Sequence, residues 1–153
     1  MTASAVRLVC VEPGATIRLE TRPAPIPEPG RGEVRLRVEA SSVNPIDVRR
    51  AHGYGRRLLA LKGAGRFPLV LGNDVAGVIE AVGPDVDRGW IGERVFGLVP
   101  VGPSGAHATH LAAAAKWLRP AAPGRTSVEL AAFPYTFTTA RLALAAAGLG
   151  DAE

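Results

Sequence analysis

Apolar and polar residues alternate most clearly over Glu33–Ala40, where Val34, Leu36 and Val38 fall on one face and charged residues fall on the other. Successive side chains of a β-strand point to opposite faces of the sheet. The alternation therefore predicts a strand with one buried face.

The run from Phe67 to Gly97 is rich in valine and is divided by glycines. Valine and isoleucine favour strands, and glycine permits bends and close approach of neighbouring backbones. This pattern predicts several short strands in a tightly closed barrel. The glycines concerned are Gly72, Gly77, Gly83, Gly89, Gly92 and Gly97.

Three further segments complete the predicted β structure. Val6–Val11 is expected to pair with Thr16–Thr21 across Pro13-Gly14, and Ala106–Leu111 is expected to form another short strand. Between them, Arg22–Arg31 contains four prolines. Because proline fixes φ and lacks a backbone donor, this segment is predicted to be an extended connector.

Helix signals concentrate at the end of the chain. Thr126 and Glu129 form a capping-box signature, which predicts a helix to about Phe133. A second helix is predicted from about Thr136 to Ala147, closed by glycine. Since this second helix is apolar over much of its surface, we expect it to be buried on most sides.

A short helical turn is also predicted within Ser42–Arg50, because Pro45 directly follows Asn44 and proline suits the first helical position. Residues 49–66, which follow, carry six basic side chains and no acidic one. Two interpretations stay open for them: a solvated loop, or a loop that rims a cleft for an anionic ligand.

Composition narrows the function classes. The 153 residues are 47% hydrophobic and 21% charged, which is enough for one globular domain. The net charge is +4, but the arginines are spread along the chain, which argues against nucleic-acid binding. Cys10 is the single cysteine, so an internal disulfide or a multi-cysteine metal site is excluded, and we expect Cys10 to be a buried apolar residue.

The sequence shows neither a leader pattern at its start nor a run near the ~20 apolar residues of a membrane span. We therefore expect a cytoplasmic protein with no membrane partner.

Five motifs occur in a recognisable order, and they cover essentially the whole chain. They are Asn44-Pro45-Ile46-Asp47, PLVLGNDVAGVIEAVG at 68–83, GERVFG at 92–97, GAHATH at 105–110 and AAFPYTFTTARLAL at 131–144. This order resembles the N-terminal catalytic, GroES-like domain of the medium-chain dehydrogenase/reductase superfamily, and most of all its zinc-free quinone oxidoreductase and enoyl reductase branch. The resemblance implies a mainly β fold: a partly open barrel with a few short helices and a C-terminal linker helix.

In zinc-dependent relatives the catalytic metal takes a cysteine at the position of Asn44 and a histidine at the position of Asn73. Amides are poor zinc ligands beside thiolate and imidazole. The resemblance therefore implies a zinc-free reductase, in which NADPH delivers a hydride to a carbon conjugated to a carbonyl of a quinone or an enone. Without zinc, hydrogen-bond donors must stabilise the developing negative charge.

The resemblance carries three site residues over. Asn44 matches an asparagine near the nicotinamide ribose and the substrate, and is given both a catalytic and a cofactor-binding role. Tyr54 lies near the tyrosine with which enoyl reductases meet the enolate or supply a proton, although it falls one residue early. Thr139 matches a threonine that borders the nicotinamide pocket. No metal ligand is implied.

Simpler interpretations of the same residues stay open. Asn44 precedes Pro45 in a common helix-entry arrangement, so it could serve only as a cap. Tyr54 could simply cover a loop, and Thr139 could only bond its own helix backbone. Asp47 and Asp74 are expected to be structural, pairing with arginines or backbone amides.

The family pattern continues with a dinucleotide-binding Rossmann unit. Residues 1–134 then correspond to the GroES-like substrate domain, and 135–153 to a helix that would lead into a Rossmann domain absent from this chain. Most of the NADPH site would be absent too. On this interpretation the chain is truncated or split, and a Rossmann-domain chain or a second copy in a homodimer is its expected partner.

A non-redox alternative is kept beside this one. In it, the domain is a free-standing relic that binds a small apolar ligand, acts as a cyclase or serves as a partner-binding module. A glycine-rich phosphate-binding turn encoded downstream would favour the reductase.

Overall fold

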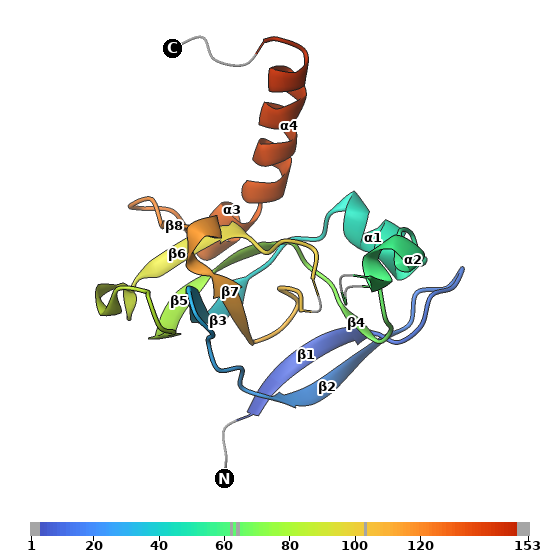
Figure 1. Ribbon diagram of the computed structural model, residues 1–153, viewed down its shortest axis with the longest axis horizontal. Coiled ribbons are helices and arrows are strands. Elements are labelled where there is room, and N and C mark those ends of the chain that lie inside the picture. Colours follow the sequence, from blue (N-terminus) through green and yellow to red (C-terminus); the bar gives the residue numbers. More distant parts are fainter. Residues whose placement is uncertain (1–3, 62, 64, 103, 150–153) are drawn as a thin grey trace.

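The computed structural model describes residues 4–61, 63, 65–102 and 104–149. Within them the chain forms two antiparallel sheets, a few short helices and one longer helix that projects away from the sheets (Figure 1). The predicted mainly β, GroES-like architecture with few short helices is confirmed.

The larger sheet has the strand order β7-β3-β5-β6-β8. Its strand β3 spans Glu33–Ala40, and Val34 and Leu36 on it are fully buried, as the alternation predicted. The strand pairs with β5 on one side and β7 on the other. The remaining strands are β5 (Asp74–Val82), β6 (Arg94–Leu98), β7 (His110–Ala114) and β8 (Leu118–Pro120).

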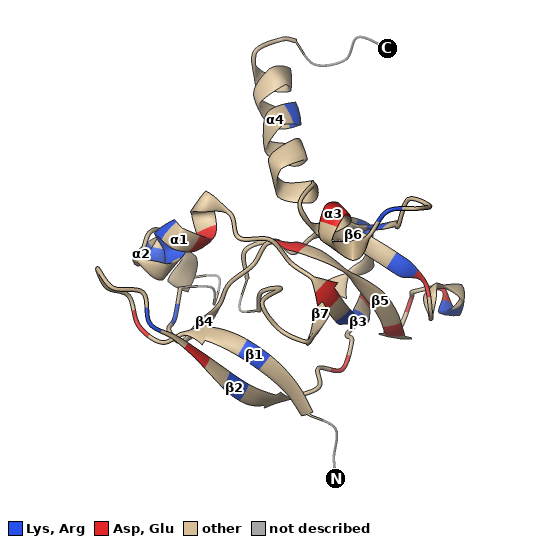
Figure 2. Cartoon of the chain, turned by 180° about the vertical axis from the view of Figure 1, so that it is seen from behind, with Lys and Arg blue, Asp and Glu red and all other residues tan. Residues whose placement is uncertain are grey.

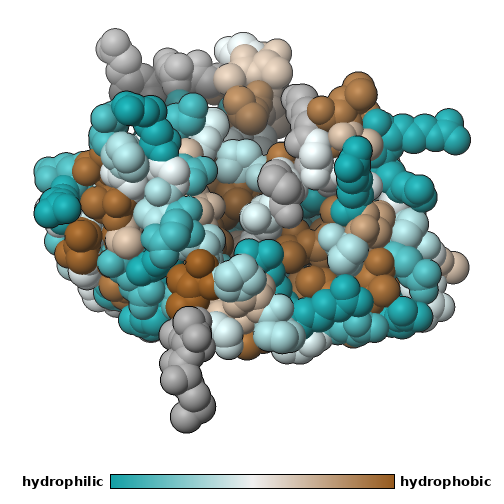
Figure 3. All heavy atoms as spheres, turned by 60° about the horizontal axis from the view of Figure 1, so that its bottom comes forward, coloured by the Kyte–Doolittle hydropathy of each residue, from teal (hydrophilic) through white to brown (hydrophobic). Residues whose placement is uncertain are grey.

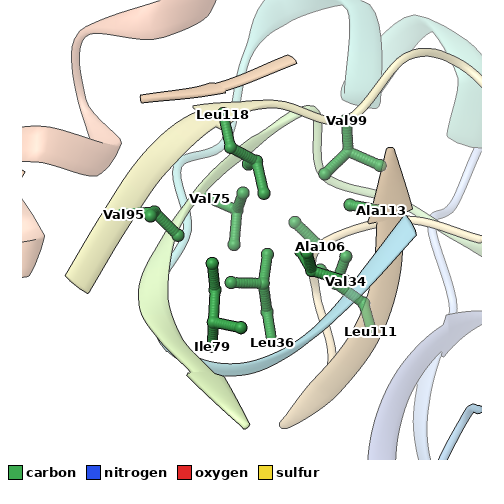
Figure 4. Packing of buried hydrophobic residues seen from close by; sticks show 10 residues of the cluster. All are labelled: Val34, Leu36, Val75, Ile79, Val95, Val99, Ala106, Leu111, Ala113 and Leu118. Carbon is green, nitrogen blue, oxygen red and sulfur yellow. The ribbon is translucent and has the colours of Figure 1, made fainter. Parts of the chain in front are cut away.

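One apolar cluster fills the space that this sheet encloses (Figure 4). Its side chains come from all five strands and from the loops around Val99 and Ala106. Burial of each Leu or Ile side chain contributes about 2 kcal/mol. The cluster holds the strands that carry the candidate site in a fixed register. Its members are Val34, Leu36, Val75, Ile79, Val95, Val99, Ala106, Leu111, Ala113 and Leu118.

The smaller sheet has the order β2-β1-β4, with β1 at Ser4–Cys10, β2 at Leu19–Pro25 and β4 at Leu69–Val70. Cys10 is fully buried in it, as predicted, and burial raises the pKa of its thiol.

The predicted partner strand Thr16–Thr21 was placed too early, since β2 runs into the proline-rich segment instead. Proline is tolerated there because β2 is an edge strand, where a missing backbone donor costs little. Only the later part of Arg22–Arg31 is a connector.

The prediction of a strand at Ala106–Leu111 was wrong in its bounds, because β7 begins at His110. Residues before it form an irregular loop that crosses to the smaller sheet through a single bridge between Arg7 and Ala108. The prediction of a loop at residues 49–66 was incomplete, since α2 occupies Arg56–Ala60.

The predicted helices form, with shifted ends. Helix α1 spans Pro45–Ala51, and α3 spans Ser127–Ala131 behind the Thr126–Glu129 capping box. Helix α4 starts at Pro134, the first helical position, and ends at Ala146. Two short 3₁₀ turns, η1 (Arg88–Trp90) and η2 (Ala115–Trp117), complete the elements.

Helix α4 is mostly exposed in this chain, and of its residues only Pro134 is buried. The expected burial on most sides is therefore not met here. Figures 1 and 2 show the helix standing clear of both sheets, joined to them only at its N-terminal end. None of the helices among the described residues could span a membrane.

Candidate functional site

Asn44 lies at the N-terminus of α1, where it is the N-cap. Its backbone N–H donates to the Asp47 carboxylate (N–Oδ2, 2.8 Å), and Pro45 follows at the first helical position. Only 6% of Asn44 is exposed. The loop between β3 and α1 therefore buries this amide and holds it against the start of β5.

Asp47 is also buried, and its second carboxylate oxygen accepts a hydrogen bond from the Gly72 backbone N–H (2.9 Å). Asp47 thus ties α1 to the loop that leads into Asn73, as its expected structural role requires. Arg50, one turn later on α1, is buried as well. Burial lowers the pKa of Arg50, and the nearby Asp47 carboxylate acts in the opposite direction.

Asp74, the first residue of β5, has no exposed surface. One carboxylate oxygen, Oδ2, accepts hydrogen bonds from the Ser42 hydroxyl and from Asn44 Nδ2 (2.9 Å). The other, Oδ1, accepts from the Tyr135 backbone N–H (2.7 Å). Charge-assisted hydrogen bonds of this kind are among the strongest in proteins, so Asp74 joins the loop after β3 to the first turn of α4.

Two of the three predicted site residues are connected through this carboxylate. Asn44 donates to Asp74, Tyr135 donates to Asp74, and the Thr139 hydroxyl donates to the Tyr135 carbonyl oxygen (2.8 Å). Thr139 does bond its own helix backbone, as the simpler interpretation expected, but its oxygen keeps acceptor capacity.

Asn73 is buried and faces the loop after β6: its Nδ2 donates to the Val99 carbonyl oxygen at 2.9 Å. Its Oδ1 is buried with no hydrogen-bond partner in the described part of the chain. If the Asn73 amide were flipped, its oxygen would face the Val99 carbonyl oxygen, and two acceptors would repel each other. The hydrogen bond to Val99 therefore identifies Oδ1 as the atom without a donor. A buried acceptor without a donor calls for an explanation, and a ligand or water with a donor group would supply one.

Tyr54 lies apart from this network, in the turn between α1 and α2. The residue is 61% exposed, and Arg49 approaches its ring at 6.0 Å from the centroid. In the described part of the chain no hydrogen bond joins Tyr54 to Asn44 or Thr139.

Several basic residues lie on α1 and α2 (Figure 2). Arg56, Arg57 and Arg66 line a shallow pocket together with Pro13 and Phe67. The pocket suits an anionic group, but nothing in it shows which interpretation of residues 49–66 holds. Both stay predictions.

The three histidines are engaged separately. His107 Nε2 lies 3.0 Å from the Ser42 carbonyl oxygen, His110 lies 3.4 Å from the Glu80 carboxylate, and His52 Nδ1 lies 2.6 Å from the Gly14 carbonyl oxygen. Across the described ranges, no three His, Cys, Asp or Glu side chains are grouped to hold a metal ion.

Residues 30–123 match the model of the alcohol dehydrogenase GroES-like domain family. The chain belongs to this family. Its predicted resemblance to the GroES-like domain of the medium-chain dehydrogenase/reductase superfamily is therefore confirmed.

Several curated relatives are similar over most of this GroES-like domain. Reticulon-4-interacting protein 1, mitochondrial, from Caenorhabditis elegans is 37% identical over 147 residues, which cover 90% of this chain and 40% of that protein. The quinone-oxidoreductase QR1, chloroplastic, from Triphysaria versicolor is 31% identical (86% of this chain, 39% of that protein). The NAD(P)H oxidoreductase RTN4IP1, mitochondrial, from Mus musculus is 34% identical (78% and 32%).

Solved structures are similar over most of this chain as well. An alcohol dehydrogenase superfamily protein from Novosphingobium aromaticivorans superposes with a TM-score of 0.82 at 30% identity, covering 95% of this chain and 42% of that one. The CurK enoyl reductase superposes with a TM-score of 0.80 at 27% identity (90% and 41%).

The chain thus spans between 32% and 40% of the length of these three relatives. Relatives named as mitochondrial and chloroplastic do not support the expected cytoplasmic location, which stays a prediction.

Sequence reasoning singled out Asn44 and Thr139 but missed what connects them. Ser42 and Tyr135 were given no role, and Asp74 only a structural one. Two adjacent polar residues, Asn73-Asp74, at the start of an otherwise apolar strand were the available signal.

Proposed function

We propose that this domain is the substrate-binding part of a zinc-independent, NADPH-dependent reductase of quinones or α,β-unsaturated carbonyls. It would work with a dinucleotide-binding domain, carried either by the same polypeptide or by a partner chain. Residues 1–134 would hold the substrate, and the helix within 135–153 would lead toward that second domain. The family and the quinone and NAD(P)H oxidoreductase relatives support a reductase with a nicotinamide cofactor.

The observation that carries the proposal is the hydrogen-bond chain from Asn44 through Asp74 and Tyr135 to Thr139. It connects the two residues proposed to border the nicotinamide, although they lie far apart in the sequence. A buried carboxylate that joins these segments is costly unless it is well hydrogen-bonded, as Asp74 is.

The residues present fit the nicotinamide end of the cofactor. Asn73 Oδ1 is a buried acceptor without a donor among the described residues, and Thr139 keeps acceptor capacity on its hydroxyl oxygen. The carboxamide and ribose hydroxyls of a nicotinamide nucleotide are donors that match such acceptors. When bound, the cofactor supplies the hydride; Asn44 and Thr139 would orient it, and Asn44 would also lie beside the substrate.

Zinc does not fit the same position. Where a zinc-dependent relative offers thiolate and imidazole, this site offers the amides of Asn44 and Asn73, and Asn44 Nδ2 is occupied by Ser42 and Asp74. Zinc prefers thiolate, imidazole and carboxylate ligands. Polarisation of the substrate carbonyl would then depend on hydrogen-bond donors.

Tyr54 is the proposed donor. Its phenol would hydrogen-bond the carbonyl oxygen of the substrate and donate its proton to the enolate formed when hydride reaches the conjugated carbon, leaving a phenolate that solvent water reprotonates. Its exposed position leaves it free to meet a substrate at the edge of α1 and α2.

The purified chain tests the proposal. NADPH is titrated while its fluorescence is followed, and its consumption is then measured with quinones and with enoyl thioesters, each with and without a zinc chelator. Because most of the NADPH site would belong to the dinucleotide-binding domain, we expect NADPH binding and chelator-insensitive turnover once that domain is present. In parallel, the reading frame beyond codon 153 is inspected for a strand followed by a glycine-rich turn. Turnover that is abolished by the chelator would overturn the zinc-independent assignment.

A second function is favoured by one observation. A small, almost wholly apolar pocket of about 120 Å³ lies between α1 and the smaller sheet, lined by residues that include Leu8, Val48 and Leu71. It would suit a non-redox role in which the domain binds a small apolar ligand. On the face that Figure 3 shows, apolar side chains lie in several separate groups among hydrophilic ones. Saturable binding of a small hydrocarbon without any response to NADPH would favour this role.

A further inference from the structure

Asp74 accepts three hydrogen bonds from two different segments of the chain. The donors are the Ser42 hydroxyl and Asn44 Nδ2 (2.9 Å) from the loop after β3, and the Tyr135 N–H (2.7 Å) from the first turn of α4. All three are neutral groups. Hydrogen bonds therefore hold the buried carboxylate, and each donor around it has a fixed direction.

The NH₂ end of the Asn44 side chain faces the Asp74 carboxylate. Its Nδ2 lies 2.9 Å from Asp74 Oδ2 and 3.0 Å from Ser42 Oγ, and these two acceptors are hydrogen-bonded to each other, so both lie on one side of the nitrogen. Ser42 can accept because its own hydrogen is given to Asp74. At least one hydrogen of the Asn44 amide is therefore engaged by the Ser42–Asp74 pair.

Oδ1 is the part of the Asn44 side chain with spare capacity. The capping box at the start of α1 turns this side chain toward the Asp47 backbone N–H, but no side-chain cap hydrogen bond forms there, and that N–H donates to the Asn44 backbone carbonyl oxygen at 2.9 Å. A flipped amide would place Oδ1 against the buried carboxylate of Asp74, where two acceptors repel each other. The Asp74 carboxylate thus decides which end of the amide is free.

We propose that Asp74 is a positioning residue, which holds the NH₂ end of the Asn44 amide so that Oδ1 is turned away from the carboxylate and presents a hydrogen-bond acceptor. The ligand group that docks on Oδ1 is then a hydroxyl or an N–H. That this group is a ribose hydroxyl or the carboxamide of a nicotinamide nucleotide rests on the proposed function.

Nuclear magnetic resonance of the ¹⁵N-labelled 153-residue chain tests the orientation without any ligand. The Asn44 side-chain NH₂ signals are identified by their loss in Asn44→Asp. In the wild type we expect at least one of the two hydrogens to be shifted downfield and to exchange slowly with water. In Asp74→Asn we expect them to move to ordinary positions and to exchange quickly, because an amide has one oxygen and cannot accept from Ser42, Asn44 and Tyr135 as the two carboxylate oxygens do.

Two further variants keep the test decisive. Ser42→Ala preserves the carboxylate and removes the second acceptor beside Nδ2, so the Asn44 hydrogens are expected to exchange faster even if Asp74→Asn fails to fold. Asp87→Asn, which alters an exposed cap of η1, is the matched control and is expected to leave the Asn44 signals unchanged. Wild-type Asn44 hydrogens that exchange as fast as those of an exposed asparagine would overturn the inference.

NADPH titration separates this inference from the proposed function. If the wild type binds NADPH, Asp74→Asn is expected to weaken binding about tenfold, the effect of one lost hydrogen bond, while Asp87→Asn leaves it unchanged. Binding that Asp74→Asn leaves intact would contradict the inference. If the wild type does not respond to NADPH even with the dinucleotide-binding domain present, the proposed function fails, and the amide signals still decide whether Asp74 orients Asn44.

Discussion

Gly77 on β5 lies so close to Arg37 on β3 that a Cβ added to the glycine would stand 2.2 Å from the Arg37 carbonyl oxygen. Real Cβ atoms do not approach oxygen this closely, so the two central strands of the barrel can pair only if this position has no side chain. Gly83 and Gly97 in the same run lie similarly close to neighbouring backbone oxygens, whereas a Cβ added at Gly92 would meet nothing within 4 Å.

We therefore expect Gly77→Ala to lower the free energy of unfolding by about 3 kcal/mol, because the β3–β5 ladder must spread to admit a methyl group. Urea titration followed by circular dichroism measures the change. Gly14→Ala is the control: its Cβ would have no neighbour closer than 3.6 Å, and we expect little effect. Equal stability of the two variants would show that the strands do not pack as described.

Helix α3 is fastened to β3 by a hydrogen bond from the Ser127 hydroxyl to Glu39 Oε2 (2.7 Å). This hydrogen bond, aided by the charges of Arg37 and Arg94 against an opposing effect of burial, lowers the pKa of Glu39. A carboxyl whose folded pKa is lowered adds stability above its unfolded pKa, and that stability is lost as the pH falls through the folded value.

Ser127→Ala is accordingly expected to reduce the free energy of unfolding by about 1 kcal/mol at neutral pH, with the difference from the wild type vanishing in acid. Thermal or urea unfolding across a pH series measures both curves. Val128→Ala, next along the helix and 73% exposed, is the control and should show no such pH dependence. A constant difference at all pH values would mean that Glu39 is not the acceptor.

The strands with a strong pattern could be predicted from the sequence. Val34 and Leu36 alternate with charged residues, and their strand formed where expected. The β7 strand was misplaced because its alanine-rich segment, His110–Ala114, carries little β propensity and is held by pairing with β3. The second strand was misplaced because proline was taken to end it, whereas an edge strand accepts proline.

The candidate site was predictable only in part. Resemblance pointed to Asn44 and Thr139, but no local pattern shows that Asp74 connects them. Its partners Ser42 and Tyr135 lie 32 and 61 positions away, so their contact follows from the way β3, β5 and α4 come together. Nor could the sequence show which end of the Asn44 amide is free, since that depends on these hydrogen bonds.

Tyr54 offers a clean test of chemistry because its loss should not disturb the fold. Tyr54→Phe keeps the ring beside Arg49, and the side chain is largely exposed, so we expect the free energy of unfolding to change by less than about 0.5 kcal/mol. In an enzyme that contains this domain, loss of the phenol should lower kcat about a hundredfold, as expected for a general acid. Tyr135→Phe is the matched control, since Tyr135 contributes its backbone to the site. Unchanged turnover in Tyr54→Phe would remove Tyr54 from the mechanism.

Asn73 occupies the second of the two positions at which zinc-dependent relatives carry a metal ligand. A substitution there tests how its buried amide is oriented. Asn73→Asp keeps the shape of the side chain but turns its donor to Val99 into an oxygen, so two acceptors would face each other out of water. We expect a loss of about 3 kcal/mol in the free energy of unfolding near neutral pH.

The loss should depend on pH in a defined direction. Burial and the facing Val99 oxygen disfavour the ionised form of the introduced carboxyl, which raises its folded pKa above the unfolded value. The free energy of unfolding of the variant should therefore be closest to that of the wild type in acid, where the protonated carboxyl can donate to Val99. It should decrease relative to the wild type as the pH rises through the folded pKa. Urea unfolding of both proteins at several pH values measures this. A variant as stable as the wild type at neutral pH would mean that the Asn73 amide does not face Val99 and that Oδ1 is not the unmatched atom.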